Sequence, residues 1–355
     1  MNMALLELLR SRPDSFFWPE AIARSLGISP AAVLRDTKEL EEFGFVIDRE
    51  PHRGFRYGGP AERLCPDQIE WKLGTRTIGR RIAVWQRTTS TNNLAARAAK
   101  SQANDGLVVL AEHQTAGRGR RHRRWHAPPC TAVLGSVLLF PPAAARNVAL
   151  LTSLAAVAVA DVINEHCDLP ARIKWPNDVR VNGLKVCGIL VEDLAVRRGR
   201  VAAPTRGDDG PPRAAGADAN TRTNSPNSLR ATVIGIGVNV NLEPRDFPRE
   251  LAAPATSLMA LCGHRLDRSE IARSLIQRLD HYYQLAHAGN AAPIWTRWRE
   301  SADLIDRPVR VERADGELFG WLKDICPHRT IVIEDASGRL VRMPTQDVLS
   351  IREWS

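Results

Sequence analysis

The sequence predicts an α+β protein built from several domains. The chain has 355 residues, more than one hydrophobic core usually organises. Apolar residues recur at helical spacing near the amino terminus, strands alternate with helices in the middle, and short strands separated by turns follow Pro308. These three patterns indicate an amino-terminal helical domain, a central domain with a mixed β-sheet and helices, and a small carboxy-terminal β-barrel.

Residues 1–60 have the pattern of a winged helix-turn-helix. Three helices are predicted, over residues 4–10, Pro19–Leu26 and Pro30–Phe43. Gly27 lies in the turn between the last two, and Ser29 is suited to cap the third. Two apolar runs after Gly44 predict a short hairpin, at residues 45–47 and 55–57. In this motif the second helix of the helix-turn-helix pair, here Pro30–Phe43, lies in the major groove of DNA.

The central domain is expected over residues 81–304, after a linker at 61–80 with a short helix near 66–73. Strands are predicted at residues 82–86, 107–112, 132–140 and 171–175, and helices at 92–101 and 146–166. Asn182-Gly183 is a strong two-residue turn signal between β-branched runs, which predicts a hairpin. This turn places Lys185 two residues into the returning strand.

Two further features complete the central domain. Residues 197–230 are rich in Pro, Gly, Asp, Asn and Arg and have almost no large apolar side chain, which predicts a disordered insertion at a hairpin tip. The strand after it is expected at 231–241. Asp267, with Glu270 three residues later, predicts the start of a helix that Gly289 ends. The carboxy-terminal β-barrel is expected over 305–355.

Composition excludes several classes of protein. Lys and Arg number 49 and Asp and Glu 40, which gives a net charge of +9 and suggests an anionic partner. Six scattered cysteines have neither CxxC nor Cys/His ligand spacing, so a disulfide framework and a zinc site are not expected. The longest apolar run, 148–162, is too short and too polar to span a membrane. We therefore expect a soluble cytoplasmic protein with no membrane partner.

The amino-terminal domain contributes nothing to that excess of positive charge. Residues 1–60 contain eight Lys and Arg against nine Asp and Glu. DNA contacts are nevertheless expected from the third helix and the wing, which together could form a local basic face. The candidates are Ser29, Arg35, Lys38, Arg53 and Arg56. The alternative is an interaction module that does not bind DNA.

Four stretches carry the residues suited to chemistry, and each has a plain structural alternative. TTSTNN at 88–93 suits either a helix N-cap or a polar ligand, and GRGRRHRRW at 117–125 suits either a solvated basic loop or an anion site. KWPND at 174–178, followed by Lys185 and GILVE, places lysines in a hairpin, where they are usually surface charges. GIGVNVN at 235–241 has strand glycines of the kind that allow close approach of a ligand.

In this order the four motifs closely resemble those of the biotin protein ligases. With the winged helix-turn-helix in front, the chain is similar to the bifunctional biotin ligase/biotin-operon repressor subgroup. The resemblance extends over nearly the whole chain except residues 197–230. It implies a class II synthetase-like catalytic domain and a carboxy-terminal SH3-like barrel.

The resemblance also implies the reaction and its regulation. Biotin and ATP, with Mg²⁺, would form biotinyl-5'-AMP and pyrophosphate, and a lysine of the biotin carboxyl carrier protein of acetyl-CoA carboxylase would then take the biotinyl group. Biotinyl-5'-AMP would also be the corepressor, promoting a homodimer that binds operator DNA. Two rivals remain open, a biotin-sensing transcription factor without catalysis and a lipoate ligase.

Carried over to this sequence, the resemblance assigns a role to each matching residue. Lys185, Arg118 and Arg120 would be catalytic. Biotin would be bound by the residues Ser90, Thr91, Asn92, Gln114, Arg118, Gly119, Arg120, Lys185, Gly235 and Gly237. ATP would be bound by Arg120, Arg121, Trp125, Asn177, Lys185 and Asn239, with added positive potential from Arg123, and Asp178 would lie near the metal. His122 departs from the family, whose loop often has glycine there.

Overall fold

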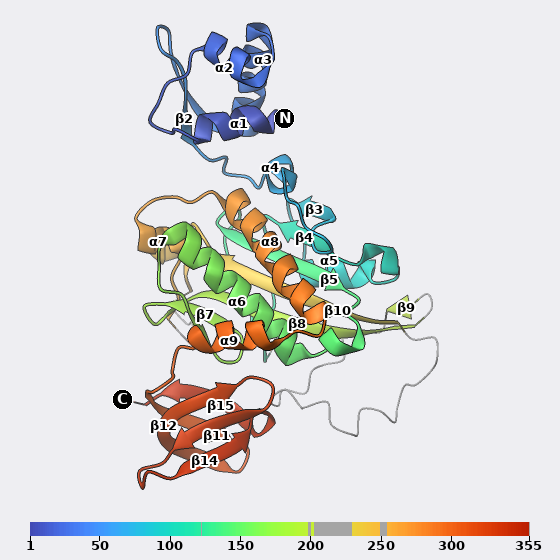
Figure 1. Ribbon diagram of the computed structural model, residues 1–355, viewed down its shortest axis with the longest axis vertical. Coiled ribbons are helices and arrows are strands. Elements are labelled where there is room, and N and C mark those ends of the chain that lie inside the picture. The colour runs from blue at the N-terminus through green and yellow to red at the C-terminus, as the bar shows by residue number, and fades with distance from the viewer. Residues whose placement is uncertain (122, 198–199, 202–228, 249–253, 355) are drawn as a thin grey trace.

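The computed structural model describes residues 1–121, 123–197, 200–201, 229–248 and 254–354. Its strands form a two-stranded, an eight-stranded and a five-stranded sheet. Figure 1 shows these sheets in three successive layers along the long axis, with the amino-terminal helices at one end and the carboxy-terminal sheet at the other. His122 and most of the 197–230 insertion, with the disorder expected there, lie outside the described residues.

The amino-terminal domain is a winged helix-turn-helix, as predicted. Its elements are α1 (Met3–Arg10), α2 (Pro19–Leu26), α3 (Pro30–Phe43), β1 (Val46–Glu50) and β2 (Gly54–Gly59). Gly27 ends α2 with φ +67°, a left-handed conformation that glycine adopts without steric cost. The Ser29 hydroxyl accepts the Ala32 N–H at 3.1 Å and caps α3. Leu5, Ile22 and Leu40, each fully buried, hold the three helices together.

Ser29→Ala is expected to lower the free energy of unfolding by about 1 kcal/mol, because the Ala32 N–H then has no partner from the cap. Urea denaturation of the whole chain, monitored with a spectroscopic probe in the amino-terminal domain, measures the change. Ser29→Asp keeps an acceptor and should unfold close to the wild type. Equal stability of the Ala and Asp variants would contradict the capping role.

The central sheet is mixed, as predicted. In order across the sheet its strands are β3 (Arg81–Trp85), β4 (Leu107–Ala111), β5 (Ala132–Leu139), β10 (Leu229–Asn239), β8 (Leu184–Arg197), β7 (Asp178–Val181) and β6 (Arg172–Lys174), with β9 (Arg200–Val201) beside β8. Only β3 and β4 pair in parallel among these described strands. The Asn182-Gly183 hairpin is confirmed, whereas β10 begins two residues earlier than expected and ends at Asn239.

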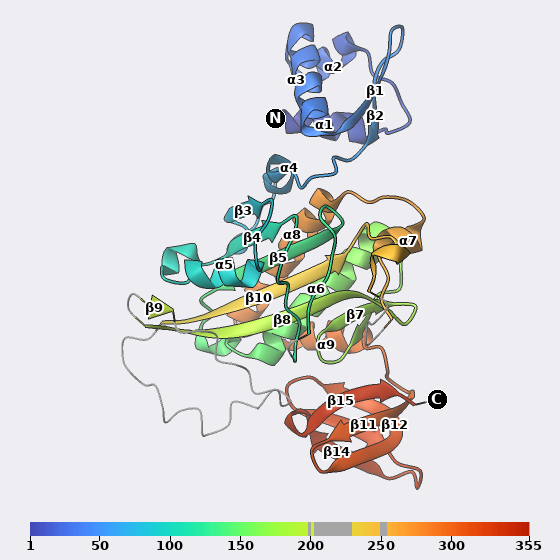
Figure 2. The same ribbon diagram turned by 180° about the vertical axis from the view of Figure 1, so that it is seen from behind.

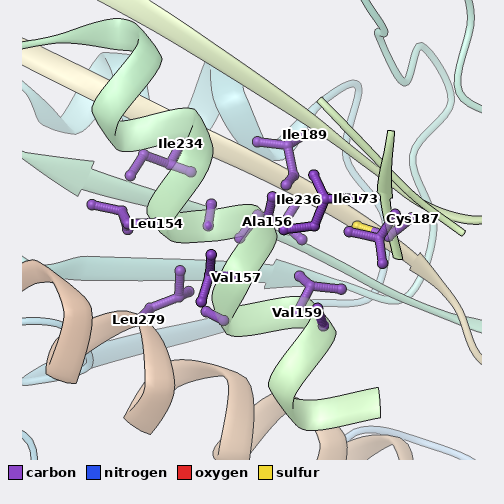
Figure 3. Close-up of a cluster of buried hydrophobic side chains, with 14 of the residues drawn as sticks. Leu154, Ala156, Val157, Val159, Ile173, Cys187, Ile189, Ile234, Ile236 and Leu279 are labelled. Carbon is purple, nitrogen blue, oxygen red and sulfur yellow. The ribbon is translucent and has the colours of Figure 1, made fainter. Parts of the chain in front are cut away.

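Helices cover both faces of this sheet. α6 (Val148–Cys167) and α8 (Arg268–His287) lie on one face, and α5 (Thr91–Ala98) lies on the other (Figures 1 and 2). Alternate side chains of a strand therefore contact different helices, with Ile234 beneath α6 and Val233 beneath α5. Figure 3 shows Leu154 and Val157 of α6 packed between the sheet and Leu279 of α8. Although α6 is long and apolar enough to cross a membrane, it is a core helix here.

The remaining elements include two helices that the sequence patterns did not predict, α7 and α9. The helices are α4 (Pro66–Glu70), α7 (Leu258–Cys262) and α9 (Ala292–Glu300), and the short 3₁₀ turns are Gln102–Asn104, Ala143–Ala145, Pro244–Asp246 and Thr345–Asp347. The carboxy-terminal strands pair antiparallel in the order β14-β13-β12-β11-β15. They span β11 (Pro308–Arg313), β12 (Gly316–Cys326), β13 (Thr330–Glu334), β14 (Leu340–Pro344) and β15 (Val348–Glu353).

Candidate functional site

A cleft of about 410 Å³ opens where the central sheet meets the loop after β4 and strand β15. Its volume lies in the range of small-molecule sites, about 300–1,000 Å³. Nine cationic residues line it, namely Arg118, Arg120, Arg121, Arg123, Arg124, Lys174, Arg180, Lys185 and Arg352. Among the described lining residues, Asp178 is the one acid. The cleft is therefore suited to a ligand with several negative charges.

One end of the cleft is a buried polar network at the first turn of α5. Ser136 Oγ donates to Asn92 Oδ1 at 2.5 Å and lies at hydrogen-bond distance, 2.7 Å, from Thr91 Oγ1. Asn92 Nδ2 donates to Glu192 at 2.6 Å, and the Thr91 N–H donates to Gln114 Oε1 at 2.7 Å. Ser90 is the N-cap residue of α5, but its hydroxyl makes no capping hydrogen bond. The TTSTNN motif thus builds a polar pocket rather than a simple helix cap.

Three strand glycines make room for this network and for Trp125. A Cβ on Gly235 would lie 2.2 Å from Asn92 Oδ1. Gly237 and Gly188 face each other across β10 and β8, and a Cβ on either would lie within 2.8 Å of the Trp125 ring. Gly235 and Gly237 were predicted to line the site, whereas Gly188 was not. The sequence feature that could have indicated Gly188 is the GILVE motif, in which a glycine interrupts a run of β-branched and large apolar residues.

Lys185 lies at the centre of the cleft. Its Nζ is 2.6 Å from Asp178 Oδ1, and its backbone pairs with the segment after residue 253, donating to Pro254 O at 3.0 Å. Arg120 reaches the same region and donates to Asn177 Oδ1 at 3.4 Å. Burial and the neighbouring Arg121 lower the pKa of Arg120. An anion placed here would relieve the repulsion between these neighbouring cations.

The GRGRR loop folds over the cleft. The Trp125 N–H donates to Gly117 O at 3.0 Å and the Gly119 N–H donates to Arg123 O at 2.7 Å, so the loop is a compact turn. Arg118 pairs with Glu192 at 3.0 Å, beside the polar pocket. Arg121 donates to Leu349 O at 2.8 Å, which joins the loop to strand β15. The loop therefore contacts both ends of the site.

The sequence analysis assigned no role to four cations of the cleft, Arg124, Lys174, Arg180 and Arg352. Burial lowers the pKa of Lys174, and Arg180 beside it lowers that pKa further. Lys174 had a signal in the KWPND motif, although no role was assigned to it. No sequence motif indicated Arg352, because only the packing of the carboxy-terminal sheet brings β15 to the cleft.

Among the described residues that line the cleft, three buried polar atoms have no protein partner. They are Asn239 Oδ1, an acceptor, and Trp125 Nε1 and Arg180 Nε, both donors. The Asn239 amide group itself is fixed, since its Nδ2 donates to Thr256 O at 3.1 Å. Leaving such atoms unpaired costs stability, which a polar ligand would recover by bonding to them.

The candidate DNA-contacting side chains are exposed but already paired. Arg35 contacts Asp36 at 2.9 Å, Lys38 contacts Glu42 at 3.3 Å, Arg53 contacts Glu50 at 3.0 Å and Arg56 contacts Asp48 at 2.7 Å. The Ser29 hydroxyl is used as the cap of α3. A DNA phosphate would have to compete with these carboxylates for each basic side chain.

Comparison with known proteins gives two family matches and several relatives. Residues 84–202 match the biotin/lipoate A/B protein ligase family and residues 3–56 match a helix-turn-helix domain. The bifunctional ligase/repressor BirA of Bacillus subtilis is 30% identical over 334 residues, 94% of each chain. The biotin–acetyl-CoA-carboxylase ligase of Mycobacterium tuberculosis is 32% identical over 305 residues, 82% of this chain and 98% of that one.

A similar fold is found among solved structures. The biotin protein ligase from Aquifex aeolicus in complex with biotin and ATP superposes with a TM-score of 0.59 at 21% identity. The match covers 78% of this chain and all of the Aquifex chain. This likeness concerns the fold.

Proposed function

Because the chain belongs to the biotin protein ligases of the biotin/lipoate A/B protein ligase family, in the subgroup with an amino-terminal helix-turn-helix domain, we propose that its cleft joins biotin to ATP. The product, biotinyl-5'-AMP, then gives its biotinyl group to a lysine of the biotin carboxyl carrier protein of acetyl-CoA carboxylase. The observation that carries the proposal is the cleft itself, in which nine cations and one acid adjoin a buried polar pocket.

The first step brings two anions together. A biotin carboxylate oxygen attacks the α-phosphorus of ATP, and the bond to the bridging oxygen breaks, so that pyrophosphate leaves. Lys185, Arg118 and Arg120 offset the repulsion and stabilise charge on the phosphate oxygens. Asp178, 2.6 Å from Lys185 Nζ, holds that side chain in place. In the second step the carrier lysine attacks the acyl carbon, and AMP leaves.

The two substrates occupy different parts of the cleft. Biotin binds the polar pocket and its glycine floor, through Ser90, Thr91, Asn92, Gln114, Arg118, Gly119, Arg120, Lys185, Gly235 and Gly237. ATP binds through Arg120, Arg121, Trp125, Asn177, Lys185 and Asn239. The unpartnered Asn239 Oδ1 and Trp125 Nε1 support the assignment of these two residues to the nucleotide, because a polar ligand would supply the missing hydrogen bonds.

Mg²⁺ would fit this site as an ion held mainly by the nucleotide. The described residues contain no group of three or more His, Cys, Asp or Glu side chains that could hold a metal. Mg²⁺ often takes one or two carboxylates together with substrate phosphates, which matches the single Asp178. Bound there, it would neutralise phosphate charge during loss of pyrophosphate.

Biotin-dependent exchange of labelled pyrophosphate into ATP tests the first step. The expected result is exchange that requires biotin and is not supported by lipoate. Exchange with lipoate instead of biotin would support the rival lipoate ligase. Tight binding of biotin with no exchange would support a sensor without catalysis.

The lowered pKa of Lys174 predicts a pH dependence of ATP binding. A bound triphosphate favours the ammonium form of Lys174 and raises its pKa. At a pH between the lowered pKa of the free protein and the higher pKa of the complex, ATP binding therefore takes up a proton. The dissociation constant for ATP should therefore increase as the pH rises through the lowered pKa. Lys174→Met should weaken binding about tenfold and flatten the profile. Calorimetry across the alkaline range measures the affinity for ATP and its pH dependence. An unchanged pH profile in Lys174→Met would contradict a contact between Lys174 and the triphosphate.

The same proposal includes repression of transcription. Biotinyl-5'-AMP is the corepressor, and the loaded protein binds operator DNA as a homodimer in the cytoplasm. The winged helix-turn-helix supports this role, although carboxylates already pair with its basic side chains. Binding to duplex DNA should therefore weaken steeply with salt and tighten with biotin and ATP. A domain that is only an interaction module would show neither effect.

The architecture we propose has four parts. They are the winged helix-turn-helix at 1–60, a linker at 61–80, the catalytic domain at 81–304 and an SH3-like barrel at 305–355. The five antiparallel strands of the last part support the barrel. Its strand β15 supplies Arg352 to the cleft, so the barrel completes the site rather than standing apart from it.

A further inference from the structure

A buried ion pair joins three distant parts of the chain. Arg268, the first residue of α8, and Glu112, the residue after β4, are each 2% exposed and lie 2.7 Å apart. The second guanidinium nitrogen of Arg268 donates to Ala132 O at 2.9 Å. Arg268 also donates to Glu62 O, and Glu112 accepts the Leu64 N–H at 2.5 Å. Both terminal nitrogens of Arg268 and both carboxylate oxygens of Glu112 thus have a partner in the backbone or in the other member of the pair.

The position of Arg268 at the start of a helix is electrostatically unfavourable for the stability of the folded protein. A helix N-terminus carries partial positive charge, which disfavours a cation there. Removing both charged groups from water costs free energy, and an apolar pair of similar size is often as stable. Such a pair therefore points to a need for precise positioning. The backbone atoms that are hydrogen-bonded to Arg268 and Glu112 show which segments the pair positions.

Those atoms belong to the two ends of one loop and to the linker. We name residues 113–131, which contain the GRGRR motif, the ligand loop. Glu112 precedes the ligand loop and also accepts the Cys130 N–H at its carbonyl, at 3.3 Å, while Ala132 follows the loop. Glu62 and Leu64 belong to the linker between the winged helix and the central sheet. The ion pair thus joins the two ends of the ligand loop to the backbone of the linker.

The next residues of α8 extend this junction to the winged helix. Ser269 Oγ accepts the Cys65 N–H at 2.9 Å, and Asp267 accepts from Gln68 at 2.7 Å. Glu270 pairs with Arg10 at the end of α1, at 3.2 Å. One helical turn thus contacts the linker, the amino-terminal domain and, through Arg268, the ligand loop.

We propose that Arg268 and Glu112 are positioning residues that fix both ends of the ligand loop and transmit its change of state to the linker and the winged helix. The proposal rests on the proposed function, since biotin and ATP are the ligands that would alter the loop. It assigns the communication between the two domains to the first turn of α8.

Hydrogen exchange of the whole chain, with and without biotin and ATP, tests the proposal. In the wild type, the ligands should slow exchange in the cleft strands β8 and β10 and also slow it at least about fivefold at linker residues 62–70, the lower limit of common allosteric coupling factors. Glu112→Gln keeps the shape but removes the charge, and Arg268→Lys keeps the charge but not the fork of donors. In both variants the cleft should still respond, and the linker should respond less than about twofold.

Asp161→Asn is the matched control. Asp161 accepts from Arg297 at 2.7 Å and from Tyr282 at 2.5 Å within the same domain, and neither partner contacts the ligand loop. Its linker response should equal that of the wild type. A linker response unchanged in Glu112→Gln and Arg268→Lys, or absent from the wild type while the cleft responds, would overturn the proposal. A cleft that does not respond in the wild type would contradict the proposed function itself.

Discussion

Lys185→Ala is expected to lower the rate of biotin-dependent pyrophosphate exchange by about 10²–10³-fold, the usual effect of removing one group that stabilises developing charge. Lys185 is one of nine described cationic residues that line the cleft, its ammonium group pairs with Asp178, and its backbone N–H and C=O bond to Pro254 and Thr256. The side chain is thus held before any substrate arrives. Its loss should affect the rate more than the binding of biotin, which the polar pocket supplies.

The cost in stability should be small by comparison. Lys185→Ala leaves Asp178 without its partner, but the cleft lets water reach that carboxylate, so the free energy of unfolding should fall by about 1–2 kcal/mol. Lys72→Ala is a suitable control, because Lys72 also pairs with a carboxylate but lies in the exposed linker. An exchange rate for Lys185→Ala within threefold of the control would contradict a catalytic role.

Gly235→Ala should weaken biotin binding by roughly 10–100-fold, because the new Cβ would lie 2.2 Å from Asn92 Oδ1. Asn92 must then move and lose its hydrogen bonds with Ser136 and Glu192. Two such bonds are worth about 0.5–1.5 kcal/mol each. The Michaelis constant for biotin should rise, with a smaller change for ATP.

Ile234→Val is the matched control for this glycine. Ile234 is the preceding residue of β10 and packs on the opposite face of the sheet, beneath α6 (Figure 3). Its truncation should cost about 0.5–1.5 kcal/mol of stability and leave the Michaelis constant for biotin unchanged. Equal Michaelis constants for Gly235→Ala and Ile234→Val would show that Gly235 does not shape the biotin pocket.

Local signals in the sequence predicted much of the fold. Gly27 and Ser29 located the helix-turn-helix, and Asn182-Gly183 located the hairpin whose returning strand carries Lys185. α7 and α9 were missed because each buries few side chains, Leu258 in α7 and Ile294 and Trp298 in α9, so neither has a distinct helical period of apolar residues. Short helices of this kind depend on tertiary packing more than on local preference.

Contacts between distant segments could not be predicted in the same way. Arg268 and Glu112 are 156 positions apart, and no local pattern indicates which buried carboxylate a given arginine meets. Arg352 reaches the cleft only through the packing of β15. The resemblance to the biotin ligases supplied the residues that we propose to contact biotin and ATP, while the residues that pack behind them could be found only from the structure.

Transfer of biotin to protein tests the central claim most directly. The full chain is incubated with ATP, radiolabelled biotin and the apo form of the biotin carboxyl carrier protein, and the carrier is then isolated under denaturing conditions. We predict ATP-dependent label on the carrier, absent when the carrier's acceptor lysine is replaced by arginine. A carrier that stays unlabelled, while the protein binds biotin and ATP, would contradict the claim and indicate a sensor rather than a ligase.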